Sequence, residues 1–463
     1  MHEINNAFNA HGAHAATPEH ADCASCSSPD ASDASSKSAD AINSPEALQA
    51  LLRVGNALAR ETDLDLLLRT ICHETELALG ADRCTVFVYD DEKKQLWSRE
   101  GTGLSGPRTI QVPAGEGLAG WVLAQNKAVN IANAYEDERF NASFDRMTGY
   151  KTVSVLAMPL QDRARRAIGV FQVLNKLSPQ GTPTSFTPLD LELLTAISAS
   201  AGIALENALL LQAKRRTFES FIETLAATID ARDPLTSGHS WRVAGYARLL
   251  GEQLHLPSAD MESLHFAALL HDIGKIGIRE EVLTKAGMLT VQEYQHIQDH
   301  VSHTYNILRR IEFEPHLREI PRIAATHHER LDGSGYGEGL SGAEIPEGGL
   351  ILAIADVFDA LTSLRHYRDR MSFLDLMGYF RSKAGTHFAP AYVNALCQLP
   401  LQKLAQVMQL DAPYKDNYTQ ASVQGLIQTM PEGVTLGDLE QQFRRADAAA
   451  HEHPFLKLYL RQF

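Results

Sequence analysis

The chain contains no long uninterrupted apolar run, since none of its hydrophobic stretches approaches the ~18 consecutive apolar residues of a membrane span. Its first ten residues, MHEINNAFNA, have neither the basic start nor the apolar core of a signal sequence. Basic charge is also scarce: 42 Lys and Arg against 57 Asp and Glu give a formal net charge of −15. Because Lys and Arg dominate contacts with nucleic acid phosphates, this balance argues against broad nucleic acid binding. We therefore expect a cytoplasmic protein that binds neither membranes nor nucleic acid.

Cysteine is rare, with five in 463 residues. Cys72, Cys84 and Cys397 stand in apolar or helical contexts, which predicts reduced, mostly buried thiols rather than a disulfide framework. The other two form a CxxC pair at Cys23 and Cys26, with three histidines upstream. A single CxxC without a second spaced pair is a weak zinc signal, so a solvated segment is the favoured interpretation.

Large apolar side chains are almost missing from residues 1–43, which predicts a disordered tail. The remainder is ordinary for a folded protein, at 44% hydrophobic and 21% charged residues overall, and its length favours at least two domains. Residues 44–189 begin with two amphipathic helical patterns and continue with β-rich runs at 84–90, 152–160 and 167–175. These patterns predict an α+β domain with an antiparallel sheet covered by helices.

A long helix is predicted over residues 190–233, which contain no proline and a single glycine. Its apolar positions alternate by three and four, with one basic interruption: Leu194, Ile197, Ala201, Ala204, Ala208, Leu211, Arg215, Phe218, Ile222, Leu225 and Ile229. This spacing favours a parallel coiled coil that joins two copies of the chain and carries a signal between domains. The alternative is a helix that packs this stripe on its own domain.

From residue 234 to about 400 the pattern is helical, which predicts an all-α second domain. Residues 401–463 add helical stretches, but the sequence does not indicate what they do. The chain has nineteen histidines, and most of them lie in the second domain. Five of these histidines and two aspartates are the candidates for a shared site: His239, His271, Asp272, His300, His327, His328 and Asp356.

Imidazoles and carboxylates in this number suffice for a two-metal site, with Asp272 as the candidate bridging ligand. Taken singly, each of these residues is more often an ordinary histidine or acid, and only their joint occurrence favours metal binding. Lys275 lies four residues after His271, so a continuing helix would bring its ammonium beside the metals. There it could polarise a phosphate oxygen or protonate a leaving alkoxide. Arg365 and Arg368 offer a second cationic pair for phosphate groups.

Three segments, HDIGKIGI at 271–278, HHERLDGSGYGEGLSG at 327–342 and IADVFDALTSLRHYR at 354–368, together resemble an HD-GYP phosphodiesterase domain over residues 215–400. The resemblance implies an HD-domain phosphohydrolase fold and hydrolysis of cyclic di-GMP at two divalent metal ions, iron or manganese, giving pGpG and, after a second cleavage, GMP. It implies that the seven residues named above are the metal ligands. The resemblance also implies that Lys275 and Asp272 are catalytic residues.

In the same resemblance, substrate is bound by Arg365 and Arg368 and by Gly335 and Tyr336 of the naming triplet. That triplet reads Gly-Tyr-Gly, with Gly337 in place of proline, which frees φ and restores an N–H. Other departures are Thr304 and His366 in place of a common glycine and proline, and Leu235 where members with a third metal have glutamate.

The first domain resembles a GAF domain, most visibly in GEGLAGWVLAQNKAVNIANAYEDERFN at 115–141. Asn175, Lys176, Phe186 and Asp190 resemble the NKFDE signature of cyclic-nucleotide-binding GAF domains, although Leu191 replaces its glutamate. A small molecule or a cyclic nucleotide is therefore a candidate ligand.

The favoured interpretation is a dimeric signalling phosphodiesterase that its GAF domain regulates. One alternative keeps the metals with another substrate, such as cyclic GMP-AMP. Another is a catalytically silent receptor that binds cyclic di-GMP or a diguanylate cyclase.

Overall fold

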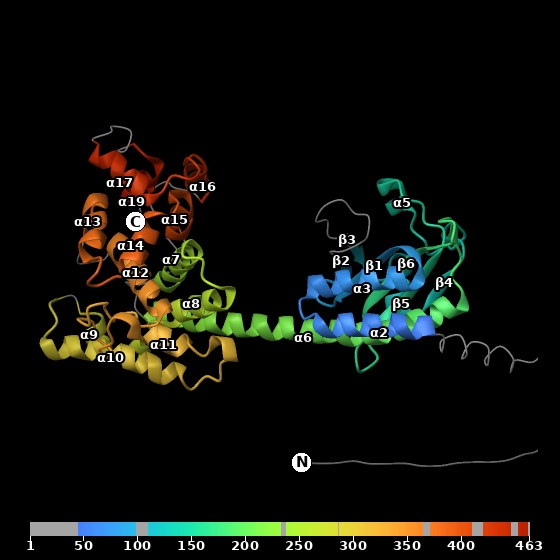
Figure 1. Ribbon diagram of the computed structural model, residues 1–463, viewed down its shortest axis with the longest axis horizontal. Helices are drawn as coiled ribbons and strands as arrows, with labels where there is room; N and C mark the ends of the chain where they lie inside the picture. Colours follow the sequence, from blue (N-terminus) through green and yellow to red (C-terminus); the bar gives the residue numbers. More distant parts are fainter. Residues whose placement is uncertain are drawn as a thin grey trace, which may run out of the picture. The chain divides into compact units, whose positions relative to one another are not determined.

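The computed structural model describes residues 45–98, 110–232, 238–285, 287–363, 371–409, 420–445 and 452–461. The chain forms two compact units, residues 1–213 and 214–463, and helix α6 (Pro188–Arg232) contributes residues to both (Figure 1). The predicted tail at 1–43, with its CxxC pair, and the predicted phosphate-binding pair Arg365 and Arg368 lie outside the described residues.

A single antiparallel sheet forms the centre of the first unit, in the order β3-β2-β1-β6-β5-β4, with β7 paired to β6. The strands are β1 (Ala81–Asp90), β2 (Gln95–Ser98), β3 (Ile110–Pro113), β4 (Val129–Ile131), β5 (Val155–Gln161), β6 (Ala167–Leu177) and β7 (Pro183–Thr184). Alternation in β1 places Val86 and Val88 in one core and Phe87 in another, on opposite faces of the sheet. The predicted α+β fold with an antiparallel sheet is confirmed.

Helices cover both faces of this sheet (Figure 1). The elements are α2 (Pro45–Arg60), α3 (Leu64–Leu79), α4 (Gly117–Gln125), η1 (Ala134–Glu136), α5 (Ser143–Thr148) and the first part of α6. The larger core joins α2, α3 and α6 to one face, and the smaller core joins α4 to the other. Cys72 in α3 and Cys84 in β1 are buried free thiols.

The apolar stripe of α6 is used within the chain, which corrects the prediction that it faces a second copy. Leu194 and Ile197 are buried in the core of the first unit, whereas Ile222 and Ile229 are buried in the core of the second. Leu211, between these two stretches, is 49% exposed. Because both ends of the stripe are buried within the chain, those positions are not available to a coiled-coil seam, and the homodimer stays a prediction.

Helix α6 is also long and apolar enough, by length and composition alone, to pass as a membrane span, with an 18-residue window of mean hydropathy 1.5. Of this window, 44% is buried inside the structure, and the core helix of a protein without a membrane passes the same test. The expectation of a cytoplasmic protein therefore stays a prediction.

The second unit is helical throughout its described part, which confirms the all-α prediction. Its elements after α6 are α7 (His239–Gln253), α8 (Ser258–Leu270), η3 (Ile273–Gly277), α9 (Glu280–Leu283), α10 (Val291–Leu308), η4 (Pro315–Leu317), α11 (Ile320–Ala325), η5 (Gly342–Glu344), α12 (Glu347–Thr362), α13 (Phe373–Lys383), α14 (Pro390–Cys397), α15 (Leu401–Met408), α16 (Gln420–Gln428), α17 (Leu436–Arg444) and α19 (Pro454–Arg461).

The last sixty residues, whose role the sequence leaves open, belong to the core of this second unit. Leu404, Leu439 and Phe455 are buried in the same cluster as the residues of α7, α8 and α12. Glu440, 1% exposed, accepts hydrogen bonds from the guanidinium groups of Arg381 in α13 and Arg444 in α17. The C-terminal helices therefore complete the domain rather than form a separate appendage.

Candidate metal centre

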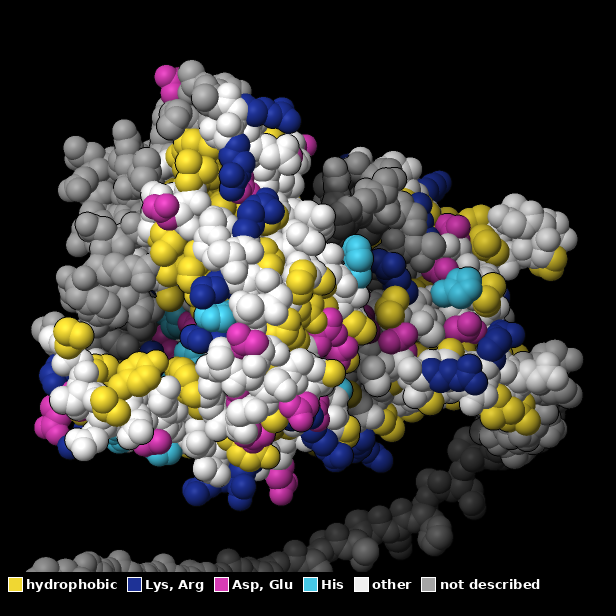
Figure 2. All heavy atoms as spheres, turned by 60° about the vertical axis from the view of Figure 1, so that its left-hand side comes forward, with side chains coloured by type: hydrophobic (Ala, Val, Ile, Leu, Met, Phe, Trp, Pro, Cys, Tyr) yellow, Lys and Arg dark blue, Asp and Glu magenta, His cyan; other side chains and the backbone are white. Residues whose placement is uncertain are grey.

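Seven side chains from separate elements of the second unit converge at one place. They are His239 at the start of α7, His271 and Asp272 directly after α8, His300 in α10, His327 and His328 directly after α11, and Asp356 in α12. All are buried except His328, which is half-buried. The structure thus brings together all seven metal-ligand candidates of the second domain. On the face shown in Figure 2, histidine side chains are visible in a hollow beside basic ones.

A close approach of two segments places His271 and His300 near each other. Gly274, in the turn after His271, packs so tightly on α10 that a Cβ there would overlap the carbonyl oxygen of His300. Thr304 fixes the same contact, because its hydroxyl donates to the His271 carbonyl at 2.9 Å and accepts from the Gly274 N–H at 3.0 Å. Thr304, which departs from the family pattern, therefore has a structural use here.

Three of the imidazoles are anchored in the same way. Nδ1 of His271, His300 and His327 each donates to the carbonyl oxygen three residues earlier, at 2.7, 2.6 and 2.6 Å. This bond fixes the tautomer and leaves Nε2 with a lone pair that faces the centre of the cluster. The Nε2 atoms of His300 and His327 are buried and have no hydrogen-bond partner in the part of the chain that the structure describes.

Asp272 lies between two groups of ligands. Its Oδ2 is 3.4 Å from Nε2 of His271 and 3.7 Å from Nε2 of His239, whereas its Oδ1 is 3.5 Å from Nε2 of His300. Asp356 Oδ1 joins the first group, at 3.3 Å from Nε2 of His239. Asp272 could therefore offer one carboxylate oxygen to each group of ligands if two metal ions were bound.

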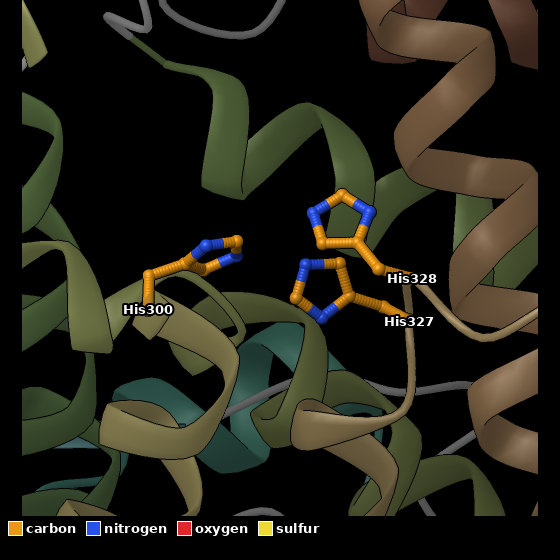
Figure 3. A group of neighbouring side chains, drawn as sticks. All are labelled: His300, His327 and His328. Atoms are coloured by element: carbon orange, nitrogen blue, oxygen red, sulfur yellow. The ribbon is translucent and has the colours of Figure 1, made fainter. Parts of the chain in front are cut away.

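Potential ligand atoms within 4.8 Å of one another form overlapping sets that match this division: His239, His271 and Asp356; His271, Asp272 and His327; and His300, His327 and His328. Figure 3 shows the last three rings turned toward a common space.

The chemistry of these residues fits divalent metal ions. Nε2 of His239 and Nε2 of His271 are 3.3 Å apart, although both face the cluster with their Nδ1 atoms already engaged. Two lone pairs at that distance repel unless a proton or a cation lies between them. Buried unpartnered nitrogens with nearby carboxylates form the mixed nitrogen and oxygen donor set that suits iron, manganese and zinc.

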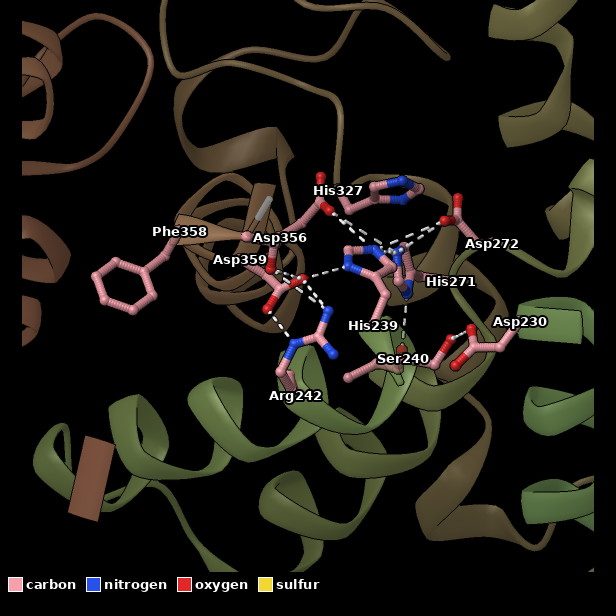
Figure 4. Close-up of polar contacts among 12 residues, drawn as sticks. Asp230, His239, Ser240, Arg242, His271, Asp272, His327, Asp356, Phe358 and Asp359 are labelled. Atoms are coloured by element: carbon pink, nitrogen blue, oxygen red, sulfur yellow. Dashed lines mark hydrogen bonds and ion pairs between the residues drawn. The ribbon is translucent and has the colours of Figure 1, made fainter. Parts of the chain in front are cut away.

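Two residues that the sequence interpretation missed hold His239 in place. Asp359 Oδ2 accepts a hydrogen bond from Nδ1 of His239 at 2.8 Å, and the Arg242 guanidinium donates to Asp359 Oδ1 at 2.7 Å (Figure 4). The available signal was spacing, because Asp359 follows Asp356 by three and Arg242 follows His239 by three, on the same faces of their helices. Burial disfavours the Asp359 carboxylate, but Arg242 and His239 outweigh it and lower its pKa to about 2.

The imidazoles of the cluster differ in the direction in which their pKa values are shifted. Burial lowers the pKa of His300, and it lowers the pKa of His328 to about 3, so both rings remain neutral near pH 7. For His239 burial acts in the same direction, but hydrogen bonds and charges from Asp356 and Asp359 outweigh it and raise the pKa to about 9. Neutral imidazole is the form that binds metal.

Lys275 and the Gly-Tyr-Gly loop flank the cluster. Lys275 Nζ lies 2.7 Å from Asp272 Oδ2, with the turn η3 in place of the predicted helical continuation. The Tyr336 ring stacks on His328, with centroids 4.5 Å apart. Gly335 packs against the backbone at residues 328–330. Gly337 has φ of +134°, which proline cannot adopt.

The four candidate GAF ligand residues have structural partners. Asn175 accepts from the Val153 N–H at 2.6 Å, and Lys176 pairs with Asp190 at 2.7 Å and joins β6 to α6. Phe186 is buried in the larger core. A cavity of about 360 Å³ lies elsewhere in this unit, and its lining includes Arg83, Phe87, Leu118, Phe140, Phe144, Tyr150 and Gln172 but none of the four. None of the four therefore borders this cavity, and a contact between them and a ligand stays a prediction.

Fold and site together define a protein with a GAF domain and an HD domain. The GAF domain family matches residues 63–205, and the HD domain family matches residues 223–392. Both resemblances drawn from the sequence are confirmed at this level.

Among its relatives are proteins with two different named substrates. The 3'3'-cGAMP-specific phosphodiesterase 2 of Vibrio cholerae is 36% identical over 219 residues, which cover 47% of this chain and 42% of that protein. The cyclic di-GMP phosphodiesterase of Thermotoga maritima is 38% identical over 178 residues, which cover 38% and 48%. The cyclic di-GMP phosphodiesterase response regulator RpfG of Xanthomonas campestris is 39% identical over 175 residues, which cover 38% and 46%. The chain thus spans less than half the length of each.

Proposed function

We propose that this chain is a metal-dependent phosphodiesterase that hydrolyses cyclic di-GMP to linear pGpG, and to GMP when the second bond is also cleaved. The observation that carries the proposal is the position of Asp272 between two groups of inward-facing imidazoles. Relatives named for cyclic dinucleotides support the substrate class. Iron or manganese in two positions is the cofactor we propose, with the seven converging side chains as ligands.

Bound divalent ions would supply Lewis acidity and a nucleophilic water near neutral pH. The residues of the chain have separate tasks. Asp359 orients His239, and backbone carbonyls orient the other imidazoles, so little reorganisation is required when a ligand binds. Lys275 holds a proton 2.7 Å from Asp272, where it can neutralise phosphate charge or protonate the leaving oxygen. Gly335 and Tyr336 lie beside His328 and are proposed to contact substrate, together with Arg365 and Arg368.

The choice of cyclic dinucleotide has a direct alternative, because relatives of similar identity are named for 3'3'-cGAMP. A catalytically silent receptor of cyclic di-GMP, or a binding partner of a diguanylate cyclase, is the other alternative. The complete ligand set and Lys275 favour an enzyme over a receptor.

We also propose that the GAF domain regulates this activity by binding a small molecule in its cavity. The lining is mainly apolar, and Arg83 provides a charge whose guanidinium carbon lies 3.7 Å from the centre of the Tyr150 ring. A cyclic nucleotide is the second candidate ligand. We expect the protein to act in the cytoplasm, as a homodimer.

Turnover measured beside metal content tests the proposal. The full chain, prepared without chelator and supplied anaerobically with Fe²⁺ or Mn²⁺, is given cyclic di-GMP and 3'3'-cGAMP separately, and products are separated by chromatography. We expect pGpG or GMP with about two metals per chain. Asp272→Ala should lose metal and turnover together. If 3'3'-cGAMP is cleaved faster than cyclic di-GMP, then 3'3'-cGAMP is the substrate. Bound metal without turnover of either compound would favour the receptor.

A further inference from the structure

The last turns of α6 make two hydrogen bonds to the segments that carry the metal centre. Ser240 Oγ donates to Asp230 Oδ1 at 2.7 Å, and both residues are buried. Two residues further along, Arg232 Nη2 donates to the carbonyl oxygen of Ile278 at 2.7 Å. Figure 4 shows the first of these contacts beside His239. All of these atoms belong to the second unit.

Each contact ends next to a group of the proposed reaction. Ser240 directly follows His239 in the first turn of α7. Ile278 closes the turn η3, because its N–H donates to the carbonyl of Lys275 at 3.0 Å, and Lys275 in turn pairs with Asp272. The two bonds therefore attach α6 to two segments of the cluster, one beside a metal-ligand candidate and the other at the turn that carries the cationic side chain.

The rest of this helix segment is fixed to the same domain. Ile222, Ala226 and Ile229 are buried in the core of the second unit, so the end of α6 packs within the domain that holds the metal-ligand candidates. The same helix begins at Pro188 and contributes Leu194 and Ile197 to the core of the first unit. A displacement of α6 would thus reach Asp230 and Arg232 through a continuous helix.

We propose that Asp230 and Arg232 are positioning residues through which α6 controls the metal centre, Asp230 by holding His239 and Arg232 by holding the Lys275 turn. The inference rests on the proposed function: on the proposed metal site for Asp230, and on the proposed turnover for Arg232. It predicts a division of effects: Asp230 governs metal affinity, and Arg232 governs turnover at constant metal content.

The full chain tests this with Asp230→Ala, Asp230→Asn, Arg232→Ala and the control Thr228→Ala, whose hydroxyl donates to the Thr224 carbonyl within α6. Mn²⁺ affinity of the metal-free protein is measured by chelator competition, and turnover by cleavage of cyclic di-GMP and of bis(p-nitrophenyl) phosphate. We expect Asp230→Ala to weaken Mn²⁺ binding by about tenfold to a hundredfold, as loss of a partner behind a ligand does. Asp230→Asn, which keeps an acceptor for Ser240, should recover most of this loss.

Arg232→Ala should lower the turnover number at least about tenfold while Mn²⁺ affinity and KM change less than about threefold, because a misplaced reacting group costs rate more than binding. If Asp230→Ala fails to fold, Ser240→Ala removes the same bond and should weaken Mn²⁺ binding equally. Values within twofold of wild type for both alanine variants would overturn the inference, as would equal losses in Asp230→Asn and Asp230→Ala. A wild-type chain without turnover would refute the proposed function, whereas the Mn²⁺ affinities would still decide the role of Asp230.

Discussion

The Asp359 carboxylate accepts a hydrogen bond from Nδ1 of His239 at 2.8 Å and so directs Nε2 of that ring toward the metal-ligand cluster. Asp359→Ala should therefore weaken metal binding by about tenfold to a hundredfold. It also removes the anion that helps to raise the pKa of His239 to about 9, so that pKa should fall. Chelator competition gives the affinity, and Glu252→Gln, at an exposed ion pair with Lys403, is the control. Unchanged affinity in Asp359→Ala would contradict a metal-binding role for His239.

Lys275 is expected to act on substrate rather than on metal. Lys275→Met keeps the length of the side chain and removes its charge, so turnover should fall by about 10² to 10⁴, the usual contribution of a positioned acid. Metal content should stay near two per chain. Lys275→Arg keeps a cation beside Asp272 and should retain more activity than Lys275→Met. A loss of metal in proportion to activity would show that Lys275 supports the ligands instead.

The stability of the metal-free second unit should fall with acid. The pKa values of His300 and His328 are lowered by burial, that of His328 to about 3, whereas an unfolded histidine titrates near about 6.5. Below about pH 6.5 the unfolded chain therefore binds protons that the folded chain does not, and the unfolding free energy falls by at most about 1.4 kcal/mol per pH unit for each ring. His239 acts oppositely, since its pKa is raised to about 9: its contribution is complete below about pH 6.5 and is lost as the pH rises through 9.

Urea unfolding of the metal-free chain at pH 7.5, 6.5 and 5.5, followed by hydrogen exchange of α7 and α10, measures this dependence. His328→Gln should reduce the slope below pH 6.5. An identical slope in that variant would show that His328 is not a source of acid sensitivity.

Gly337 should not tolerate the proline that is usual in the family triplet. Its φ of +134° is closed to proline, and a Cβ would lie 2.8 Å from Oε1 of Glu329, which accepts hydrogen bonds from the N–H groups of Glu338 and Gly339. Gly337→Pro should cost about 1–3 kcal/mol of unfolding free energy and reduce turnover, because Tyr336 would shift from His328. Gly378→Ala, in open space on α13, is the matched control for thermal unfolding and activity. Full activity with raised stability in Gly337→Pro would show that the loop adopts another conformation.

Local patterns were sufficient for the longest strands and helices and for the metal-ligand candidates. The alternating runs of β1 and β6, the helical period of α6 and α8 and the joint spacing of His271, Asp272, His327 and His328 predicted strands, helices and a cluster that the structure contains. Strands and helices depend on neighbours within a few turns of chain, so their periodicity can be read from the sequence. The metal-ligand candidates were identified by residue type instead.

The packing partner of an apolar stripe cannot be predicted in this way, because heptad spacing identifies an apolar surface but not the surface that it contacts. The stripe of α6 looked like a seam between two copies, and only the tertiary structure gave Ile197 and Ile222 to the cores of two different units. Similarly, the NKFDE-like residues match a sequence signature, yet Lys176 and Asp190 meet each other across β6 and α6 instead of lining the cavity.

The sequence by itself determined which side chains can bind metal, because ligand chemistry belongs to residue type. Only the tertiary structure decided how those side chains are held: Asp359 behind His239, Thr304 between His271 and Gly274, and Asp230 behind Ser240. These contacts join residues 10 to 120 positions apart, and their formation depends on packing of whole helices, which no local pattern encodes.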